Sequence, residues 1–188
     1  MKIEKIEHSF GLPQTGLLSI NSLDRVLKNL SLANKTPTMV FQLVFLVPLV
    51  SERQVWVGLL HSIQAFESNS NISKKPEFEI LLRLSGKRQI KEALKLFSLK
   101  EKANQEVVLV GWGKNKKALK EKAQNLGQSL GFAPKTNLFS KNFSKNKKLI
   151  LESYGISQNQ ISSFNGWKEK DAIEALVLEK MALLGLEG

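Results

Sequence analysis

A short basic turn, Ser85–Gln89 (Ser-Gly-Lys-Arg-Gln), holds the side chains best suited to chemistry in this sequence. The apolar stretch before it, Phe78–Leu84, predicts a strand, and the apolar spacing after it predicts a helix over Ile90–Phe97. Such a turn would present free backbone N–H groups and the positive end of a helix dipole, to which Lys87 and Arg88 add charge. It therefore suits an anion, phosphate above all. The alternative is a solvated loop whose charges only keep the protein soluble.

No catalytic motif accompanies this turn. The sequence lacks HExxH, GxSxG and the protein-kinase signature set. The segment Gly111–Lys114 fails the dinucleotide fingerprint at Lys116, and it fails the P-loop pattern at Asn115, where Ser or Thr is required. His8 and His61 are too isolated in sequence to suggest a metal pair, and the lack of cysteine excludes disulfides, thiolate metal sites and a cysteine nucleophile. We expect a protein that is not an enzyme and holds no cofactor or metal.

The charge of the chain bears on its partners. Its 188 residues carry a formal net charge of +11, with 28 Lys and Arg against 17 Asp and Glu. Such a surface points to nucleic acid, an acidic protein or an anionic membrane. The excess gathers in Arg83–Lys95, Lys114–Lys122 and Phe139–Lys148, although each cluster can equally be a solvated face. No signal peptide or membrane-spanning stretch is visible, so we expect a soluble, cytoplasmic protein.

The elements that must position the turn alternate between strand and helix patterns. This alternation predicts an α/β (α+β) fold: one domain over residues 1–188, with a small mixed β-sheet covered by several helices and a C-terminal amphipathic helix. Breaks are expected at Gly11, Pro13 and Gly16. Further strands and helices are expected at Lys2–His8, Thr38–Val47 and Glu106–Trp112 (strands), and after Ser22 and at Ser51–Glu67, Lys116–Leu130, Asn146–Tyr154 and Lys168–Leu184 (helices).

The segment Phe132–Lys145 is expected to be a loop. Its lysines and phenylalanines could stack on unpaired bases. We favour instead that Phe139 and Phe143 pack beneath the loop as a small satellite core.

The last helix is more apolar than one core face requires. Either it is buried on most sides, or one face docks another protein. Its apolar residues are Ile173, Leu176, Val177 and Leu184 on one face, Leu178 and Ala182 nearly opposite, and Met181 between them, with Leu183 and Leu186 near the end.

Three stretches of the sequence resemble a known family. Glu79–Ile90, which contains Ser-Gly-Lys-Arg-Gln-Ile, and the following Glu92–Leu94 look like the hallmark of the kinase-binding subunit of the KEOPS complex, the TPRKB-like family. The helix at His61–Phe66 and the closing Leu178–Leu184 fit the same pattern. The resemblance covers most of Thr38–Gly188.

The resemblance implies a non-enzymatic protein with two partners. Members bind the N-lobe of a small atypical kinase/ATPase subunit, which sits on the threonylcarbamoyl transferase subunit, and the complex installs threonylcarbamoyladenosine in tRNA. Members also hold the single-stranded CCA end of the tRNA. Carried to this chain, the RNA contacts would be Lys87 and Arg88, with Arg83, Arg25 and Lys28 if the first helix lies alongside. The kinase contacts would be Leu176, Met181, Leu183 and Leu184, with part of Ser51–Glu67.

Two other classes of function stay open on the sequence. A free-standing basic RNA-binding module without a kinase partner is compatible with the net charge of +11. A small α/β enzyme would need a pocket lined by Asp or Glu, which the sequence cannot display.

Overall fold

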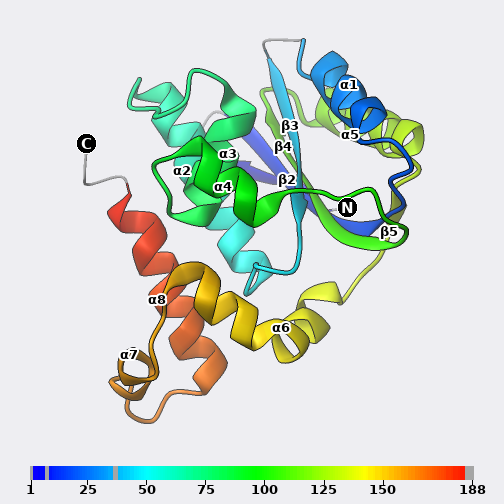
Figure 1. Cartoon of the computed structure of the whole chain (residues 1–188). Coiled ribbons are helices and arrows are strands. Elements are labelled where there is room, and N and C mark those ends of the chain that lie inside the picture. Colours follow the sequence, from blue (N-terminus) through cyan, green and yellow to red (C-terminus); the bar gives the residue numbers. More distant parts are fainter. Residues whose placement is uncertain (1, 7–8, 36–37, 185–188) are drawn as a thin grey trace.

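An antiparallel β-sheet forms the centre of the protein (Figure 1). The computed structural model describes residues 2–6, 9–35 and 38–184. Within them the strand order is β1-β2-β4-β3, with β5 paired to β2 beside β1. The α/β class is confirmed, but every pairing found in these ranges is antiparallel rather than mixed. The strands are β1 (Glu4–Ile6), β2 (Ser9–Leu18), β3 (Met39–Phe45), β4 (Gln105–Gly113) and β5 (Ala133–Pro134).

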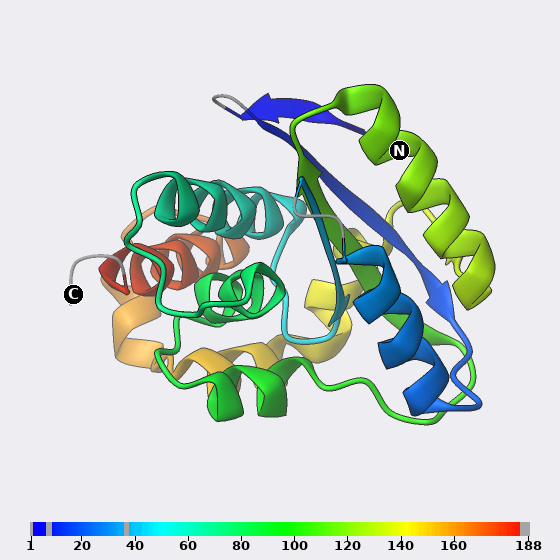
Figure 2. The same cartoon turned by 90° about the horizontal axis from the view of Figure 1, so that it is seen from above.

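Helices cover both faces of this sheet (Figure 2). One face carries α1 (Leu23–Ala33) and α5 (Lys116–Leu130), and the other carries α2 (Glu52–Glu67), α3 (Pro76–Ser85) and α4 (Ile90–Phe97). A third group packs at the end of the second layer and consists of α6 (Leu138–Tyr154), α7 (Gln158–Ser162) and α8 (Glu169–Leu183).

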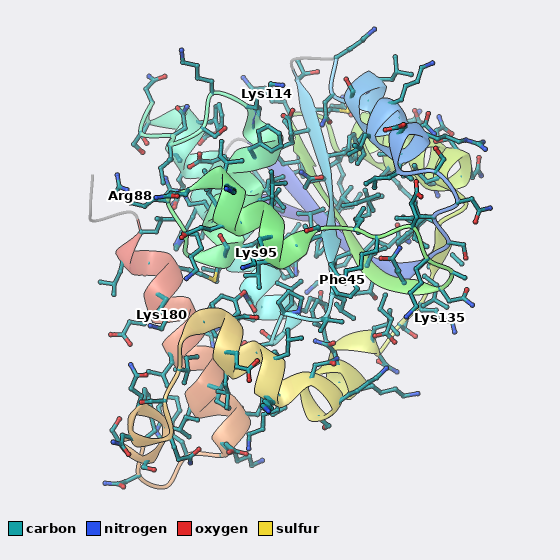
Figure 3. The ribbon with its side chains drawn as sticks, viewed as in Figure 1. Phe45, Arg88, Lys95, Lys114, Lys135 and Lys180 are labelled. Carbon is teal, nitrogen blue, oxygen red and sulfur yellow. The ribbon has the colours of Figure 1, made fainter. Side chains whose placement is uncertain are left out.

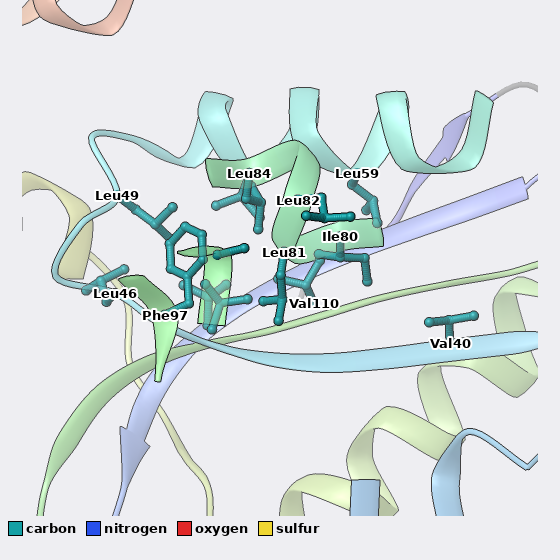
Figure 4. Packing of buried hydrophobic residues seen from close by; sticks show 14 of the residues in the cluster. Val40, Leu46, Leu49, Leu59, Ile80, Leu81, Leu82, Leu84, Phe97 and Val110 are labelled. Carbon is teal, nitrogen blue, oxygen red and sulfur yellow. The ribbon is translucent and has the colours of Figure 1, made fainter. Parts of the chain in front are cut away.

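The two covered faces explain the continuous apolar run of β4. Alternate residues of a strand point to opposite faces. Val108 and Val110 accordingly pack with α2 and α3, whereas Val107 and Leu109 pack with α1 and α5. Figure 4 shows the first of these cores, in which Val110 faces the side chains of α3.

The predicted strand at Phe78–Leu84 is wrong, because this segment is helix α3. Pro76 stands at its start, acidic residues occupy its first turn, and Gly86 ends it in the left-handed conformation at φ +62°. All three are helix signals. The continuous apolar run nevertheless predicts a strand. It arises because α3 lies in the middle of the helical layer, where every residue of Glu79–Ser85 is buried and no polar stripe marks a helical period.

The predicted break after the first strand is also wrong. Gly11, Pro13 and Gly16 lie inside β2, the longest strand described. A Cβ at Gly11 would come 2.5 Å from Leu59, and one at Gly16 would come 2.5 Å from the ring of Phe132. The glycines therefore let side chains approach the strand closely. Pro13 lies between the stretch of β2 paired to β1 and the stretch paired to β5. On this edge of β2, away from β4, no described strand pairs with Pro13, so its missing N–H costs no hydrogen bond there.

The expected loop before Asn146 is helical. Helix α6 spans Leu138–Tyr154 with a kink at Asn146, whose φ is −120° and ψ 15°, so the predicted short helix is its second half. The buried Asn142 amide nitrogen donates to the carbonyls of Leu46, Val47 and Leu49, which ties α6 to the loop after β3. Phe143 is buried and Phe139 half-buried, so both pack inward, but they join two different core clusters rather than forming a satellite core of their own.

The outer edge of β3 is closed by a side chain. The Asn34 amide accepts from the Phe41 N–H at 2.8 Å and donates to the Phe41 carbonyl at 2.9 Å. It thus makes the two hydrogen bonds that a neighbouring strand would make there.

The other predicted elements are confirmed within a residue or two. These are α1 with Ser22 as N-cap, β3, α2 with Ser51 as N-cap, α4, β4, α5 with Gly131 as its left-handed C-cap, and α8. The first strand is present as β1, whereas His8 and Leu186 lie outside the described residues.

Candidate functional site

The basic turn links two helices rather than a strand and a helix. Gly86 reverses the chain after α3, and the Lys87 N–H donates to the Leu82 carbonyl at 3.4 Å and to the Ser85 hydroxyl at 3.2 Å. That backbone donor is therefore used inside the turn and is not free for an anion. What remains for a ligand is side-chain charge: Lys87 is half-buried and Arg88 is exposed.

A hollow of about 220 Å³ lies between this turn and the end of α8. A Cβ on Gly86 would come within 3.2 Å of the Lys180 carbonyl oxygen, so only glycine lets the turn approach α8 this closely. Arg88 and Lys180 both lie on the side of the molecule that carries α2 and α8 (Figure 3). The walls are formed by Ser85, Gly86, Lys87, Tyr154, Lys180, Leu183 and Leu184.

A buried polar cluster fixes the floor of the hollow. The Gln54 amide nitrogen donates to the Tyr154 hydroxyl at 2.5 Å and to the Leu84 carbonyl at 3.1 Å, and the Tyr154 hydroxyl donates to the same carbonyl at 3.2 Å. The Gln54 amide oxygen accepts from the Val50 N–H at 2.8 Å. Burial raises the pKa of the Tyr154 phenol, so this ring acts as a neutral donor. The cluster holds α2, α3 and α6 together beneath the basic turn.

Arg83, one of the predicted RNA contacts, is a structural residue instead. Its side chain is 6% exposed, and its Nε donates at 2.8 Å to Glu79, whose side chain is fully buried. A second nitrogen donates to the Ser70 carbonyl at 3.4 Å, and Glu79 accepts from the Ser73 N–H at 2.7 Å. The ion pair thus anchors the loop between α2 and α3, and these contacts assign Arg83 a structural part.

Arg25 and Lys28 lie far from the turn. Both are exposed on α1, which covers the face of the sheet opposite to α3 and α4 (Figure 2). The condition under which Arg25 and Lys28 would join the RNA contacts, that the first helix lies alongside the turn, is therefore not met. Of the five predicted RNA contacts, only Lys87 and Arg88 share a surface with each other and with the hollow.

The predicted kinase contacts are mostly core residues. Leu176, Met181 and Leu184 are 5%, 0% and 4% exposed, because they fill the space between α8 and the rest of the helices. They cannot form a docking surface while the protein is folded. Leu183 is different, since it is 44% exposed beside the hollow.

The side of α8 that remains accessible is the face with Leu178 and Ala182. Leu178 of α8 and Val57 of α2 are half-buried and pack against the same core cluster, and Ala182 is exposed. Ala182 also lines a second hollow, of about 240 Å³, with His61 and Arg83. We call this surface the α2–α8 strip and define it by Val57, Leu60, His61, Ala175, Leu178 and Ala182.

His61 is the titratable residue of the α2–α8 strip. Burial lowers its pKa, and the charge of Arg83 lowers it further. The strip is therefore uncharged at neutral pH, as suits the centre of a protein interface.

The sequence predicts the strip only in part, as a second apolar face of the last helix with Leu178 and Ala182 and as an unspecified part of Ser51–Glu67, and it does not predict Lys180. The signal for the strip was the second apolar face of the last helix. Which face is buried depends on packing partners that the sequence does not reveal. For Lys180 the sequence gives no signal, because its place in the hollow depends on how the turn seats on α8.

Within the described residues, no group of three or more His, Asp or Glu side chains is placed to hold a metal ion. In the same ranges no helix has the length and apolar character needed to cross a membrane.

A family model described as kinase binding protein CGI-121 matches residues 21–185, which is most of the chain. No curated protein matches the sequence.

Proposed function

Because this chain belongs to the family of kinase binding protein CGI-121, we propose that it is the kinase-binding subunit of a KEOPS-type tRNA-modification complex. In this proposal it catalyses no reaction. It binds the small atypical kinase/ATPase subunit, and through it the threonylcarbamoyl transferase subunit. It also recruits tRNA by the single-stranded 3′ CCA end, in support of threonylcarbamoyladenosine formation.

The α2–α8 strip, with the exposed Leu183 at its end, supports the kinase half of the proposal. Stable interfaces have an apolar centre from which charged residues are depleted and a polar rim. The strip has that character: Leu178 and Ala182 are apolar, His61 is held neutral, and Glu179 and Lys180 lie beside them on α8. It is the single observation that carries this half, because it brings accessible apolar residues of two helices together.

The hollow between the turn and α8 supports the RNA half. Lys87 and Lys180 line it, and Arg88 lies next to it in the turn. Lysine and arginine bind phosphate without regard to sequence. Among the described residues that line it, Tyr154 is the only aromatic one, and its ring is buried. Tail binding here therefore relies on phosphate contacts and should weaken with salt.

The two proposed contacts are neighbours. Leu183 shares the walls of the hollow with Lys87 and Lys180. Leu183→Glu therefore places a carboxylate beside both lysines, and we expect it to weaken tRNA binding as well as kinase binding. Ala182→Glu lies on the strip and outside this hollow, so it is the better variant for weakening kinase binding alone.

The kinase half can be tested by titrating the purified kinase subunit with variants of this chain. Leu149 is a matched control for Leu183, because both are 44% exposed leucines on helices. We expect Leu183→Glu and Ala182→Glu to weaken binding at least about 10-fold, the effect of about 1.4 kcal/mol, and Leu149→Glu to have no effect. Equal binding by all three variants would place the kinase elsewhere, and no binding by the natural protein would favour a free-standing RNA-binding module.

The RNA half can be tested with one tRNA, with and without its CCA tail, at several salt concentrations. We expect the natural protein to prefer the tailed RNA and the Lys87→Gln, Arg88→Gln double variant to lose that preference. An undiminished preference in the double variant would remove the turn from the site.

A further inference from the structure

A second concentration of positive charge lies on the opposite side of the sheet, over α1 and α5. The segments 21–35 and 114–131 hold eight basic residues against two acidic ones, Asp24 and Glu121, which is a net +6 of the chain's +11. We call this the α1–α5 surface and define it by the exposed Arg25, Lys28, Lys35, Lys114, Lys116, Lys117 and Lys120.

The two helices form one continuous layer. They run antiparallel, since the Asn29 amide near the middle of α1 donates to the Ser129 carbonyl at the end of α5 at 3.5 Å. At the other end, the pairing of Met39 with Gly113 brings the segment after α1 next to the segment before α5. Lys35 and Lys114 therefore lie at the same end of the layer.

The make-up of this surface favours nucleic acid over the other partners of a basic patch. Its cations are lysines except for Arg25, and protein interfaces are depleted in lysine and enriched in arginine and aromatic residues. A membrane surface would call for an apolar face among the cations. Helix α1 exposes two leucines, Leu27 and Leu32, next to its cations. The exposed residues of α5 include no apolar residue, being Lys116, Lys117, Lys120, Glu121, Gln124, Asn125, Gln128 and Ser129, so the surface as a whole has no continuous apolar face.

We propose that the α1–α5 surface binds the phosphates of double-helical RNA. Lys116 and Lys120 are one turn apart on α5, about 6 Å along its axis, and so present successive charges to a backbone. Flexible lysines deliver point charges to phosphates and read no sequence. The surface therefore serves RNA binding that does not depend on a single-stranded tail.

This second contact cannot be an extension of the first. The α1–α5 layer and the turn at Lys87 lie on opposite sides of the sheet, roughly 20 Å apart by the usual spacing of packed layers. Since a 3′ tail is single-stranded and the body of a tRNA is largely double-helical, the two surfaces fit different parts of one molecule. The proposal rests on the tRNA binding proposed above and adds the part of the RNA that the turn does not reach.

The test compares two variants with the same change in net charge. Lys117→Glu with Lys120→Glu alters the α1–α5 surface, and Lys141→Glu with Lys145→Glu alters exposed positions of α6 as the control. Each changes the formal charge from +11 to +7. Both leave helix formation favourable, because Glu and Lys have similar helix propensities. Circular dichroism and thermal melting check the fold of each variant.

The probes are a blunt RNA duplex and a tRNA with or without its CCA tail. We expect the Lys117, Lys120 variant to bind the duplex about 60-fold more weakly in 0.1 M salt. Each phosphate contact adds about 0.9 decades of affinity when the salt concentration falls from about 1 M to 0.1 M, and the variant loses two contacts. Its salt slope should fall by about 1.8, while the Lys141, Lys145 control should stay within about 3-fold of the natural protein.

Three results would overturn the proposal: no binding of the duplex by the natural protein, no loss in the Lys117, Lys120 variant, or an equal loss in both variants, which would make the effect one of net charge. Failure of the tail site is read separately. In that case the natural protein binds tailed and tailless tRNA equally, while only the Lys117, Lys120 variant loses binding of the duplex. That pair of results would support the α1–α5 surface and contradict the tail site.

Discussion

Replacing Arg83 by methionine would test whether this arginine holds the fold together or binds RNA. Methionine keeps much of the aliphatic length of the side chain and removes its charge. The Glu79 carboxylate would then remain fully buried and would keep the hydrogen bond from the Ser73 N–H. The Ser70 carbonyl would lose the hydrogen bond that Arg83 donates to it. Removing one partner of a buried ion pair costs about 3–5 kcal/mol, because the other charge is left without compensation.

The expected loss is large for a protein of this size. We place it at about 3–4 kcal/mol, since the Ser73 N–H still stabilises the carboxylate. Typical domains have only about 5–15 kcal/mol of stability, and 1 kcal/mol lowers the melting temperature by about 2–4 °C in chains of 150–250 residues. Urea unfolding at 20 °C gives the free energy, and calorimetry gives the melting temperature. Lys91→Met, which removes an exposed cation from α4, should change stability by less than about 0.5 kcal/mol.

A double variant distinguishes the lost ion pair from lost packing. Glu79→Gln with Arg83→Met keeps an acceptor for the Ser73 N–H and leaves no charge in the interior. We expect it to recover at least about 1.5 kcal/mol of what Arg83→Met loses, as neighbouring residues in one network do not act additively. At a temperature where each variant is folded, tRNA affinity should match that of the natural protein. Unchanged stability together with lost RNA binding in Arg83→Met would refute the structural role.

Three further changes give independent checks. Burial and the charge of Arg83 lower the pKa of His61, so the unfolded chain takes up a proton before the folded one as the pH falls. The folded state should therefore lose stability below about pH 6.5. Urea unfolding at several pH values should show a shallower loss in His61→Gln. Gly86→Ala should destabilise the protein more than Gly131→Ala in thermal melts, since both glycines have positive φ but only the first would press a Cβ against α8; equal losses would contradict the contact. Asn142→Leu removes the amide donor shared by three loop carbonyls, of which the Leu46 carbonyl keeps the Leu49 N–H, and should cost about 2–3 kcal/mol in chemical unfolding. A loss below about 1 kcal/mol would mean that water replaces the amide.

Local signals in the sequence were sufficient wherever an element has one buried face. The apolar stripe of α5 with Gly131 at its end, and the Ser22 cap of α1, each predict a helix that packs on one side only. The apolar run of β4 also predicts its strand, because such runs are typical of strands buried on both faces. These predictions rest on hydrogen bonds and periodicities within a few residues.

The errors fall where burial hides the period or where packing decides. Helix α3 is buried over Glu79–Ser85, so its sequence shows the continuous apolar run of a strand. The glycines of β2 look like breaks, although Gly11 and Gly16 make room for Leu59 and Phe132 from other elements. The same reason applies to the predicted binding residues Arg83 and Leu176. Their side chains have the right chemistry, but both are buried, because their exposure is decided by neighbours distant in the sequence.

The Asn34 side chain on the edge of β3 also affects how this protein can associate. An exposed edge strand invites the same strand of another molecule, and pairing of that kind can propagate into aggregates. By occupying the N–H and carbonyl of Phe41, Asn34 makes the chain a poor template for such growth. Contacts with other macromolecules are thereby directed to the helical surfaces, where side chains select the partner. Asn34→Ala should leave those surfaces intact and yet raise light scattering during storage at high concentration.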